Sequence, residues 1–293
     1  MQYKEVEADA SDITVRVTLQ GLRGGHSGLE INEGRGNANK LMARLVRQAI
    51  ADDEACLVAW HGGNMRNAIP RTAQVTLNIQ PENLDDLREL VAHCEETFPN
   101  EYRWGEENVT ITLETCDKCA MQMPQEIQDN VVDALMACHD GVLRNIPSIP
   151  SVVETSSNLG IIDIADGKVE VLILGRSSSE TMMEYLQEMQ SCCFAMAGMR
   201  VAFSGKYGAW QPNFDSPIVA TMVDVYRRTF SEEAVVQVCH AGLECSIIGG
   251  VYPHMDLVSF GPTLRSPHTP DERCNIPSVA KFWTFLKALL AEL

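Results

Sequence analysis

The strongest constraint on the fold is the order of periodic segments near the start of the chain. Four segments are predicted strands, two of them with strict alternation of apolar and polar side chains: residues 12–20, 55–63, 72–80 and 108–116. Two further segments carry apolar side chains at helical spacing: residues 37–50, which Asn37 can cap, and residues 81–98. The resulting order, β-α-β-β-α-β, predicts a ferredoxin-like unit.

A partial repeat of this order follows the first unit. Helices are predicted over residues 124–143 and 179–197, and strands over residues 152–163, 168–177 and 199–205. Asp166 and Gly167 separate two of these strands with the composition of a two-residue hairpin turn. We therefore expect a duplicated α+β unit whose two sheets lie side by side.

The pattern changes after residue 205, where a segment rich in glycine, tryptophan and proline begins. Beyond it, the predicted elements are a helix over 216–230, a strand over 234–240, a short helix from Gly242, a strand over 255–261 and a helix over 277–292. Two strands are too few for a stable sheet. The predicted division is a tail at 1–8, an α+β domain at 9–205, and part of a larger α/β sheet at 206–293.

Composition and charge exclude several classes of protein. The formal net charge of −17 would repel a phosphate backbone, so nucleic acid is not an expected partner. No run of apolar residues is long enough to span a membrane, and the first residues lack the features of a signal peptide. Ten cysteines lie mostly in apolar segments, as in reduced cytoplasmic proteins. Cys116 and Cys119 supply only half of a structural zinc site.

Two histidines each follow the end of a predicted strand in the last part of the chain. His240 ends the first strand, and His268, in "SPHTPDE", follows the second. Ligands of open α/β sheets bind at this edge, and Glu244 follows in the next helical turn. His254 and Asp256 have the attractive spacing H-x-D, but they precede their strand, and we interpret them as turn residues.

The α+β domain offers other candidates, each with a purely structural alternative. His26 lies in "GGHSG", which allows close approach of the backbone to a ligand or is simply a tight turn. Asn67, in "MRNAIPR", suits recognition of a carbonyl or carboxylate group, or caps a turn. His93 and His139 are expected in helices without a role in a site. The tandem glutamates at 95–96, 106–107 and 232–233 are expected to be solvated.

Long motifs carry a resemblance to a known family. In this order, the segments "GLRGGHSGLEINEGRGNANKLMARLV", "GGNMRNAIPR", "VVETSSNLGII", "HAGLEC" and "GPTLRSPHTPDE" resemble the aminoacyl-histidine dipeptidases, also called Xaa-His or cytosol non-specific dipeptidases. These are zinc metallopeptidases of the carnosinase clan, and the resemblance extends from about residue 12 to 290. It implies a lid domain at 9–205, inserted into a catalytic α/β domain whose last part is 206–293.

The resemblance also implies roles for individual residues. His268 corresponds to one ligand of a site for two zinc ions, or for other divalent metals. The remaining ligands of the family precede the lid and have no counterpart here. His26 corresponds to a histidine that stabilises the oxyanion, and Asn67 to a residue that contacts substrate. Arg176 resembles an arginine that binds the substrate carboxylate, although "GRSSSE" departs from the usual motif. His240 and Glu244 resemble residues of the substrate pocket.

Three interpretations of the function remain open. The chain is a cytoplasmic dipeptidase, acting on Xaa-His and other short peptides, presented without its N-terminal metal-binding segment. Alternatively, it is a non-catalytic homologue that binds peptides or forms a homodimer through the lid. In the third interpretation, a separate polypeptide supplies the missing segment.

Overall fold

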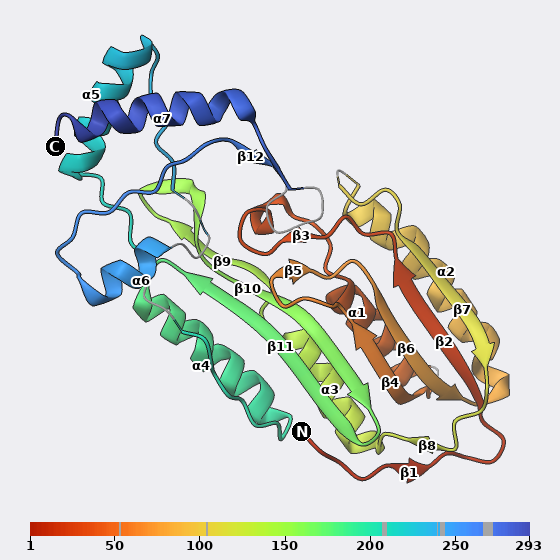
Figure 1. Ribbon diagram of the computed structural model, residues 1–293. Coiled ribbons are helices and arrows are strands. Elements are labelled where there is room, and N and C mark those ends of the chain that lie inside the picture. The colour runs from red at the N-terminus through yellow and green to blue at the C-terminus, as the bar shows by residue number, and fades with distance from the viewer. Residues whose placement is uncertain (53, 104, 207–209, 239, 241–243, 266–271) are drawn as a thin grey trace. The chain divides into compact units, whose positions relative to one another are not determined.

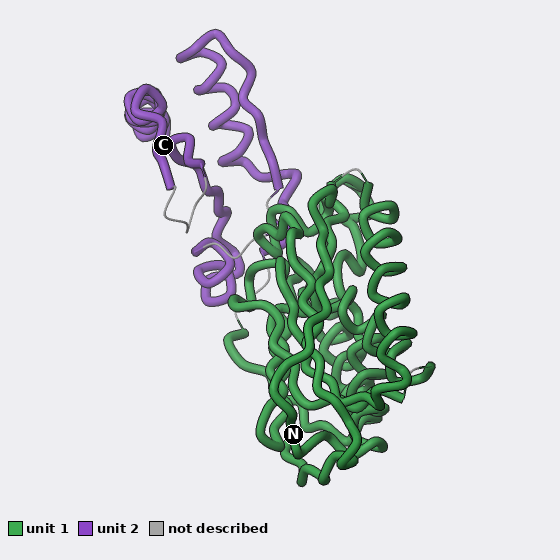
Figure 2. The backbone as a smooth tube through the Cα atoms, turned by 90° about the vertical axis from the view of Figure 1, so that its right-hand side faces the viewer, with its two compact units in different colours: residues 1–206 green, residues 207–293 purple. Residues whose placement is uncertain are grey.

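The computed structural model describes residues 1–52, 54–103, 105–206, 210–238, 240, 244–265 and 272–293. These residues form two compact units, which are coloured separately in Figure 2: unit 1 is Met1–Lys206 and unit 2 is Tyr207–Leu293. Each unit is described by itself.

Unit 1 is built on one antiparallel sheet of seven strands, in the order β11-β10-β4-β6-β2-β7, with β9 also paired to β10 (Figure 1). The strands of the first half are β2 (Ile13–Gln20), β4 (Cys56–Gly62), β6 (Ala73–Ile79) and β7 (Thr110–Cys116). Together with α1 (Ala38–Asp52) and α2 (Leu84–Glu101), they form the predicted ferredoxin-like unit. The second half adds β9 (Gly141–Ile146), β10 (Ile149–Ala165), β11 (Lys168–Ser177), α3 (Gln125–Ala137) and α4 (Glu180–Met196).

The core of unit 1 lies between the sheet and its helices, which cover one face of the sheet in Figure 1. The alternation in β2 explains which face is covered. Val15, Val17 and Leu19 are fully buried in the core, whereas Arg16 and Thr18 between them stay partly exposed. Burying each such apolar side chain stabilises the fold by roughly 1.5–3 kcal/mol. The helices therefore pack where the two-residue period of the sequence directs them.

The prediction of two sheets side by side was wrong, because one strand joins both halves into a single sheet. With 17 residues, β10 is long enough to have two partners along the same edge. Its first part pairs with β9, and Ile162–Ile164 pair with Trp60–Gly62 of β4. The predicted helix over 124–143 ends earlier than expected because β9 begins at Gly141, so His139 lies just beyond α3.

Along this edge of β10, the backbone between the part paired with β9 and the part paired with β4 has no neighbouring strand among the described residues. Side chains take the place of a strand there. At Leu159, the backbone N–H donates to Asp140 Oδ1 at 2.7 Å. The carbonyl oxygen of Leu159 accepts from the amides of Asn37 and Asn39, each at 3.2 Å. Asn37 also caps α1 as predicted, since its Oδ1 accepts from the Asn39 N–H at 2.9 Å. Buried backbone groups that have no strand beside them are thereby satisfied.

Four short strands complete unit 1: β1 (Val6–Glu7), β3 (Gly25–His26), β5 (Ala68–Ile69) and β8 (Met121–Gln122). They form two small ladders, β1 with β8 and β3 with β5. The hairpin turn between β10 and β11 is as predicted, with φ of 50° at Asp166 and 72° at Gly167. The described residues 199–205, a predicted strand, belong to no strand.

Unit 2 contains α5 (Pro217–Phe230), α6 (Glu244–Val251) and α7 (Ile276–Leu290), and a short ladder of β12 (Leu264–Arg265) with β13 (Arg273–Cys274). Its small core lies between α5 and α7, around Met222 and Phe285. Asp256 accepts from Ser216 Oγ and from the Ile218 N–H, which fixes the start of α5. Asp256 therefore has a structural contact, in line with its interpretation as a turn residue.

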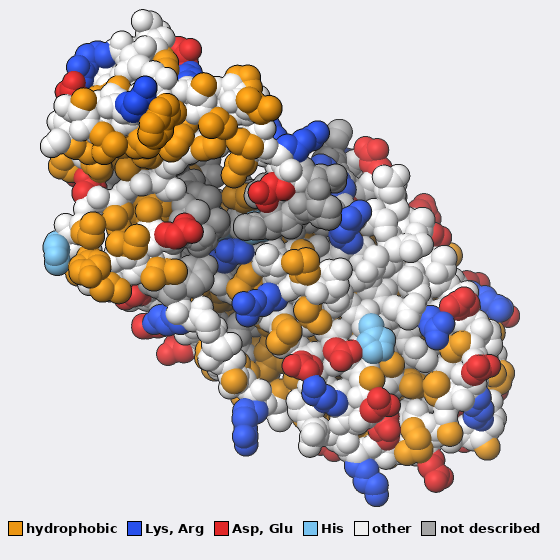
Figure 3. All heavy atoms as spheres, viewed as in Figure 1, with side chains coloured by type: hydrophobic (Ala, Val, Ile, Leu, Met, Phe, Trp, Pro, Cys, Tyr) orange, Lys and Arg blue, Asp and Glu red, His pale blue; other side chains and the backbone are white. Residues whose placement is uncertain are grey.

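The two strands predicted in unit 2 were wrong for the described residues. Residues 234–238 and 255–261 belong to no ladder, because no neighbouring strand is available to them in the described part of unit 2. Large apolar side chains are exposed instead, and Figure 3 shows hydrophobic side chains gathered over α7. Val235 and Ile276 are each 82% exposed. No helix in the described residues has the length and apolar character needed to cross a membrane.

Candidate functional site

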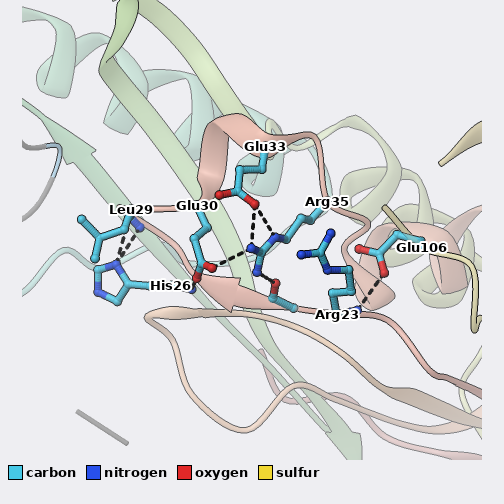
Figure 4. A network of polar contacts seen from close by, with 9 residues as sticks. Arg23, His26, Leu29, Glu30, Glu33, Arg35 and Glu106 are labelled. Carbon is cyan, nitrogen blue, oxygen red and sulfur yellow. Dashed lines mark hydrogen bonds and ion pairs between the residues drawn. The ribbon is translucent and has the colours of Figure 1, made fainter. Parts of the chain in front are cut away.

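The glycine-rich segment between β2 and α1 is closed into a loop by one buried carboxylate. Glu106 is fully buried and accepts a hydrogen bond from the backbone N–H of Arg23 at 2.7 Å (Figure 4). It also accepts one from the backbone N–H of Gly36 at 3.0 Å. It therefore holds the two ends of the loop together. The prediction that this glutamate is solvated was wrong, since its neighbour Glu107 takes the exposed position.

A second polar cluster lies inside this loop. Arg35 donates to Glu30 and Glu33, each at 2.6 Å, and also to the carbonyl oxygen of Gly24 (Figure 4). Burial alone would lower the pKa of Arg35, but its hydrogen bonds to Glu33 and Glu30 outweigh that effect and raise the pKa. The other oxygen of Glu30 accepts from the backbone N–H of His26 at 2.7 Å. The ion pair thus fixes the backbone at the candidate histidine.

Gly25 is required by this arrangement. Its φ of 143° is a conformation that side chains rarely allow. A Cβ atom at this position would lie 2.3 Å from Arg35 Nη1 and 2.7 Å from Glu30 Oε2. A glycine is therefore needed before His26 in "GGHSG", because the Glu30–Arg35 ion pair packs closely against the backbone at Gly25.

The ring of His26 has a defined tautomer. Its Nδ1 accepts hydrogen bonds from the backbone N–H of Gly28 and of Leu29, each at 3.1 Å (Figure 4). An Nδ1 that accepts two hydrogen bonds carries no proton, so the neutral ring carries its proton on Nε2. The half-buried His26 can therefore offer an N–H donor to an oxygen atom.

The segment with Asn67 lies directly against the His26 turn. His26 pairs with Ala68 in the short ladder of β3 with β5, and the backbone N–H of Ser27 donates to the carbonyl oxygen of Asn67 at 2.9 Å. Asn67 is half-buried. Two candidates that are far apart in the sequence are thus held together by backbone hydrogen bonds.

Arg176 joins them from the edge strand of the sheet. Its Nε and Nη2 both lie 3.5 Å from Oγ of Ser27, a residue that is 1% exposed. These contacts are long for hydrogen bonds. Three candidates from the sequence, His26, Asn67 and Arg176, therefore converge around Ser27. Asn67 contacts Ser27 through its backbone carbonyl oxygen, and Arg176 does so through its guanidinium.

The candidates in unit 2 are less completely described. His240 is half-buried, and Glu244 is the first, exposed residue of α6. His268, the predicted metal ligand, lies outside the described residues. Within the residues that the structure does describe, no group of three or more His, Cys, Asp or Glu side chains could hold a metal ion. The described donors therefore do not fit a zinc site.

The fold of unit 1 defines a class of domain. Residues 17–106, the ferredoxin-like half that contains His26 and Asn67, match the family model described as the peptidase dimerisation domain. The class of domain that these residues define is therefore the peptidase dimerisation domain.

Two known proteins show the resemblance more specifically. The chain is 38% identical over 280 residues to the cytosol non-specific dipeptidase of Escherichia coli (strain K12), covering 96% of this chain and 58% of that protein. The aminoacylhistidine dipeptidase of Vibrio alginolyticus has the same fold, with a TM-score of 0.91 and 38% identity, over 100% of this chain and 60% of that one. The resemblance to aminoacyl-histidine dipeptidases is confirmed. The chain spans about three fifths of the length of either relative.

Sequence reasoning did not identify the acidic residues that support the site. Glu30 and Glu106 are ordinary glutamates in the sequence, one inside the glycine-rich segment and one 70 positions beyond Gly36. No local pattern distinguishes Glu106 from Glu107. Only the closure of the loop shows which of the two is buried.

Proposed function

We propose that this chain is the lid and the C-terminal catalytic part of a metal-dependent dipeptidase, which hydrolyses Xaa-His and other short peptides with a free carboxylate. The observation that best supports this proposal is the convergence of His26, Asn67 and Arg176 around Ser27. Together, these groups match the polar groups of a dipeptide, which has one peptide carbonyl and one terminal carboxylate.

Each residue has a role that follows from its chemistry. The Nε2–H of His26 donates to the peptide carbonyl oxygen, on which negative charge develops during hydrolysis. Since Nδ1 is held by Gly28 and Leu29, the ring does not need to reorient for this task. The guanidinium of Arg176 binds the carboxylate, and the amide of Asn67 orients the peptide. For His240 and Glu244 of unit 2, only the resemblance to the family supports a contact with substrate.

Two zinc ions, or other divalent metals, would supply an activated water in such an enzyme. We propose His268 as one ligand and assign the others to the part of the relatives that has no counterpart in these residues. The described residues contain no group of three or more His, Cys, Asp or Glu side chains that could hold a metal ion. The proposed work of unit 1 is therefore to bind and orient the peptide and to stabilise charge on its carbonyl oxygen.

The proposal includes the assembly and the location of the protein. A homodimer formed through unit 1 agrees with the description of the matching family model. A cytoplasmic location agrees with the name of the Escherichia coli relative and with the nine free thiols in the described residues. Light scattering coupled to size-exclusion chromatography measures the assembly state.

Binding of a dipeptide tests the role of Arg176. Titration of the chain with Ala-His and with Ala-His amide, followed by NMR, compares ligands that differ only in the carboxylate. We expect the amide to bind roughly tenfold or more weakly, because a hydrogen bond to a charged group contributes about 1.5–3 kcal/mol. Arg176→Lys should reduce the affinity for Ala-His and the preference for the carboxylate. Arg16→Lys, on the same sheet, is the control.

Equal affinity for both ligands, or equal effects of the two substitutions, would contradict the proposed role of Arg176.

A second candidate function is peptide binding without catalysis. The observation that favours it is the convergence of His26, Asn67 and Arg176 around Ser27, which can bind a peptide without a metal ion. Metal content and hydrolysis of Ala-His, measured on the chain alone and with an added N-terminal segment of a relative, separate the two. Activity that appears only with the added segment supports the dipeptidase. If the chain alone binds two zinc ions tightly and hydrolyses Ala-His, it contains all of the metal ligands itself, and the assignment of the other ligands to a further segment is wrong.

A further inference from the structure

The segment that carries Asn67 is seated on strand β10 with no space for side chains between them. A Cβ atom at Gly160 of β10 would lie 2.8 Å from the Cα of Arg66. A Cβ atom at Gly63 would lie 1.9 Å from the carbonyl oxygen of Gly160. The two backbones are therefore in direct contact at this point, and β10 serves as the platform for residues 63–68.

One buried side chain of β10 holds this segment in place. Asn158 is 1% exposed, and its Nδ2 donates to the carbonyl oxygens of Arg66 and Ala68, each at 2.9 Å. Only the NH₂ group of the amide can donate to two carbonyl groups, so the orientation of the side chain is fixed. These carbonyl groups stand immediately before and after Asn67. Asn158 thus restrains the backbone on both sides of a proposed substrate-binding residue.

The restraint extends to the other members of the site. The carbonyl oxygen of Asn67 accepts from Ser27, the residue after His26 and the contact of Arg176. Ser156, two residues before Asn158 on β10, is paired with Arg176 across the sheet. A single stretch of β10 therefore supports the Asn67 segment directly and lies beside Arg176.

We propose that Asn158 is a positioning residue for peptide binding: its amide holds the backbone around Asn67 so that Asn67 and His26 face the same ligand. The effect on peptide affinity rests on the proposed function, whereas the effect on the backbone does not. Asn158 itself needs no contact with the peptide.

A second buried asparagine provides a matched control. Asn78 is fully buried in β6 of the same sheet, and its Nδ2 donates to the carbonyl oxygen of Cys119 at 3.1 Å and to Gln122 at 3.0 Å. It also holds a loop to the sheet through its amide. Its hydrogen-bond partners Thr14, Cys119 and Gln122 are not candidate site residues. Replacement of Asn78 should therefore lower stability without moving the segment that carries Asn67.

The experiment compares Asn158→Asp with Asn78→Asp in the full chain. Asn158→Asp removes both donors and places a carboxylate beside two carbonyl oxygens, at almost unchanged volume. Three quantities are measured: the melting temperature, the hydrogen-exchange rate of the Ser27 amide, and the affinity for Ala-His. We expect both variants to melt at lower temperature. Only Asn158→Asp should accelerate exchange at Ser27 and weaken peptide binding, each about tenfold or more, because each of the two lost hydrogen bonds contributes a factor of about five.

Each outcome decides the proposal. Equal exchange at Ser27 in the two variants would overturn it, and so would unchanged peptide affinity in Asn158→Asp while the wild type binds. If the wild type binds no peptide, the proposed function fails, and the exchange rate still tests whether Asn158 fixes the backbone. If Asn158→Asp does not fold, Asn158→Ser, which keeps a single donor, is compared in its place and should give a smaller change in the same direction.

Discussion

Replacement of Glu106 by glutamine is the most direct test of how the His26 loop is held. The carboxylate accepts one backbone N–H with each oxygen, from Arg23 and from Gly36. Glutamine has nearly the same shape but only one acceptor oxygen, so its NH₂ group must face one of the two N–H groups. The variant therefore leaves one buried donor without an acceptor and creates no cavity.

The expected cost follows from that single donor. A buried polar group left without a partner costs roughly 1–3 kcal/mol. Unit 1 comprises Met1–Lys206, and for a domain of this size each kcal/mol lowers the melting temperature by about 2–4 °C. We therefore expect Glu106→Gln to melt about 2–12 °C below the wild type. The amides of Arg23 and Gly36 should lose protection from hydrogen exchange first, because the loop ends are no longer joined.

Glu107→Gln is the control, since it removes the same charge from the adjacent, exposed position. Calorimetry gives the melting temperatures, and hydrogen exchange followed by NMR gives the local effect. If the two variants have the same melting temperature and the same exchange at Arg23 and Gly36, the loop does not depend on Glu106 and this reasoning is refuted.

Three further predictions concern other parts of the chain. Burial raises the pKa of Asp140, so the folded chain binds a proton at this carboxyl group more tightly than the unfolded chain does. The free energy of unfolding should therefore fall as the pH rises from the ordinary pKa of aspartate through the raised pKa. Asp140→Asn should remove this fall, and melting temperatures of both proteins across that range measure it. Gly25→Ala should weaken the protection of the His26 amide from hydrogen exchange, because the new methyl group overlaps the Glu30–Arg35 ion pair. Gly34→Ala is the control: it has φ of 68° and open space around it, so it should cost only about 1–2 kcal/mol of backbone strain and leave the His26 amide protected. The exposed apolar side chains of unit 2 should cause self-association that light scattering detects as a rise in mass with concentration; Val235→Ser combined with Ile276→Ser should reduce it, and an unchanged rise would place the contact elsewhere.

The sequence predicted those parts of the fold that depend on local periodicity. The alternation of β2, the helical spacing of α1 and the turn at Asp166-Gly167 are properties of neighbouring residues, and all three were confirmed. The single sheet was not predicted, because it depends on three residue pairs between β10 and β4, about a hundred positions apart in the sequence. Such pairing leaves no local pattern.

The candidate site likewise contains residues that the local sequence identified and residues that it did not. His26 and Asn67 were marked by unusual local composition, a glycine turn and a segment before proline. Their supports, Glu106 and Asn158, were not marked, because a buried polar side chain in a loop or strand looks like any other until its distant partner is known. The predicted strand over 255–261 failed for a related reason, since a strand forms only where a neighbour is present to pair with it.

The gap beside Leu159, between the two partners of β10, determines how accurately the halves of unit 1 are aligned. Apolar surfaces tolerate small sliding movements, whereas hydrogen bonds of fixed length do not. Asn37 and Asn39 at the start of α1, and Asp140 beyond α3, all bond to the same residue of β10. The start of one helix and the residue after another are thereby locked to one point on a strand. Asn158 is the residue before Leu159 in β10. The hydrogen bonds at Leu159 therefore also fix the position of β10 relative to the segment around Asn67, which Asn158 holds.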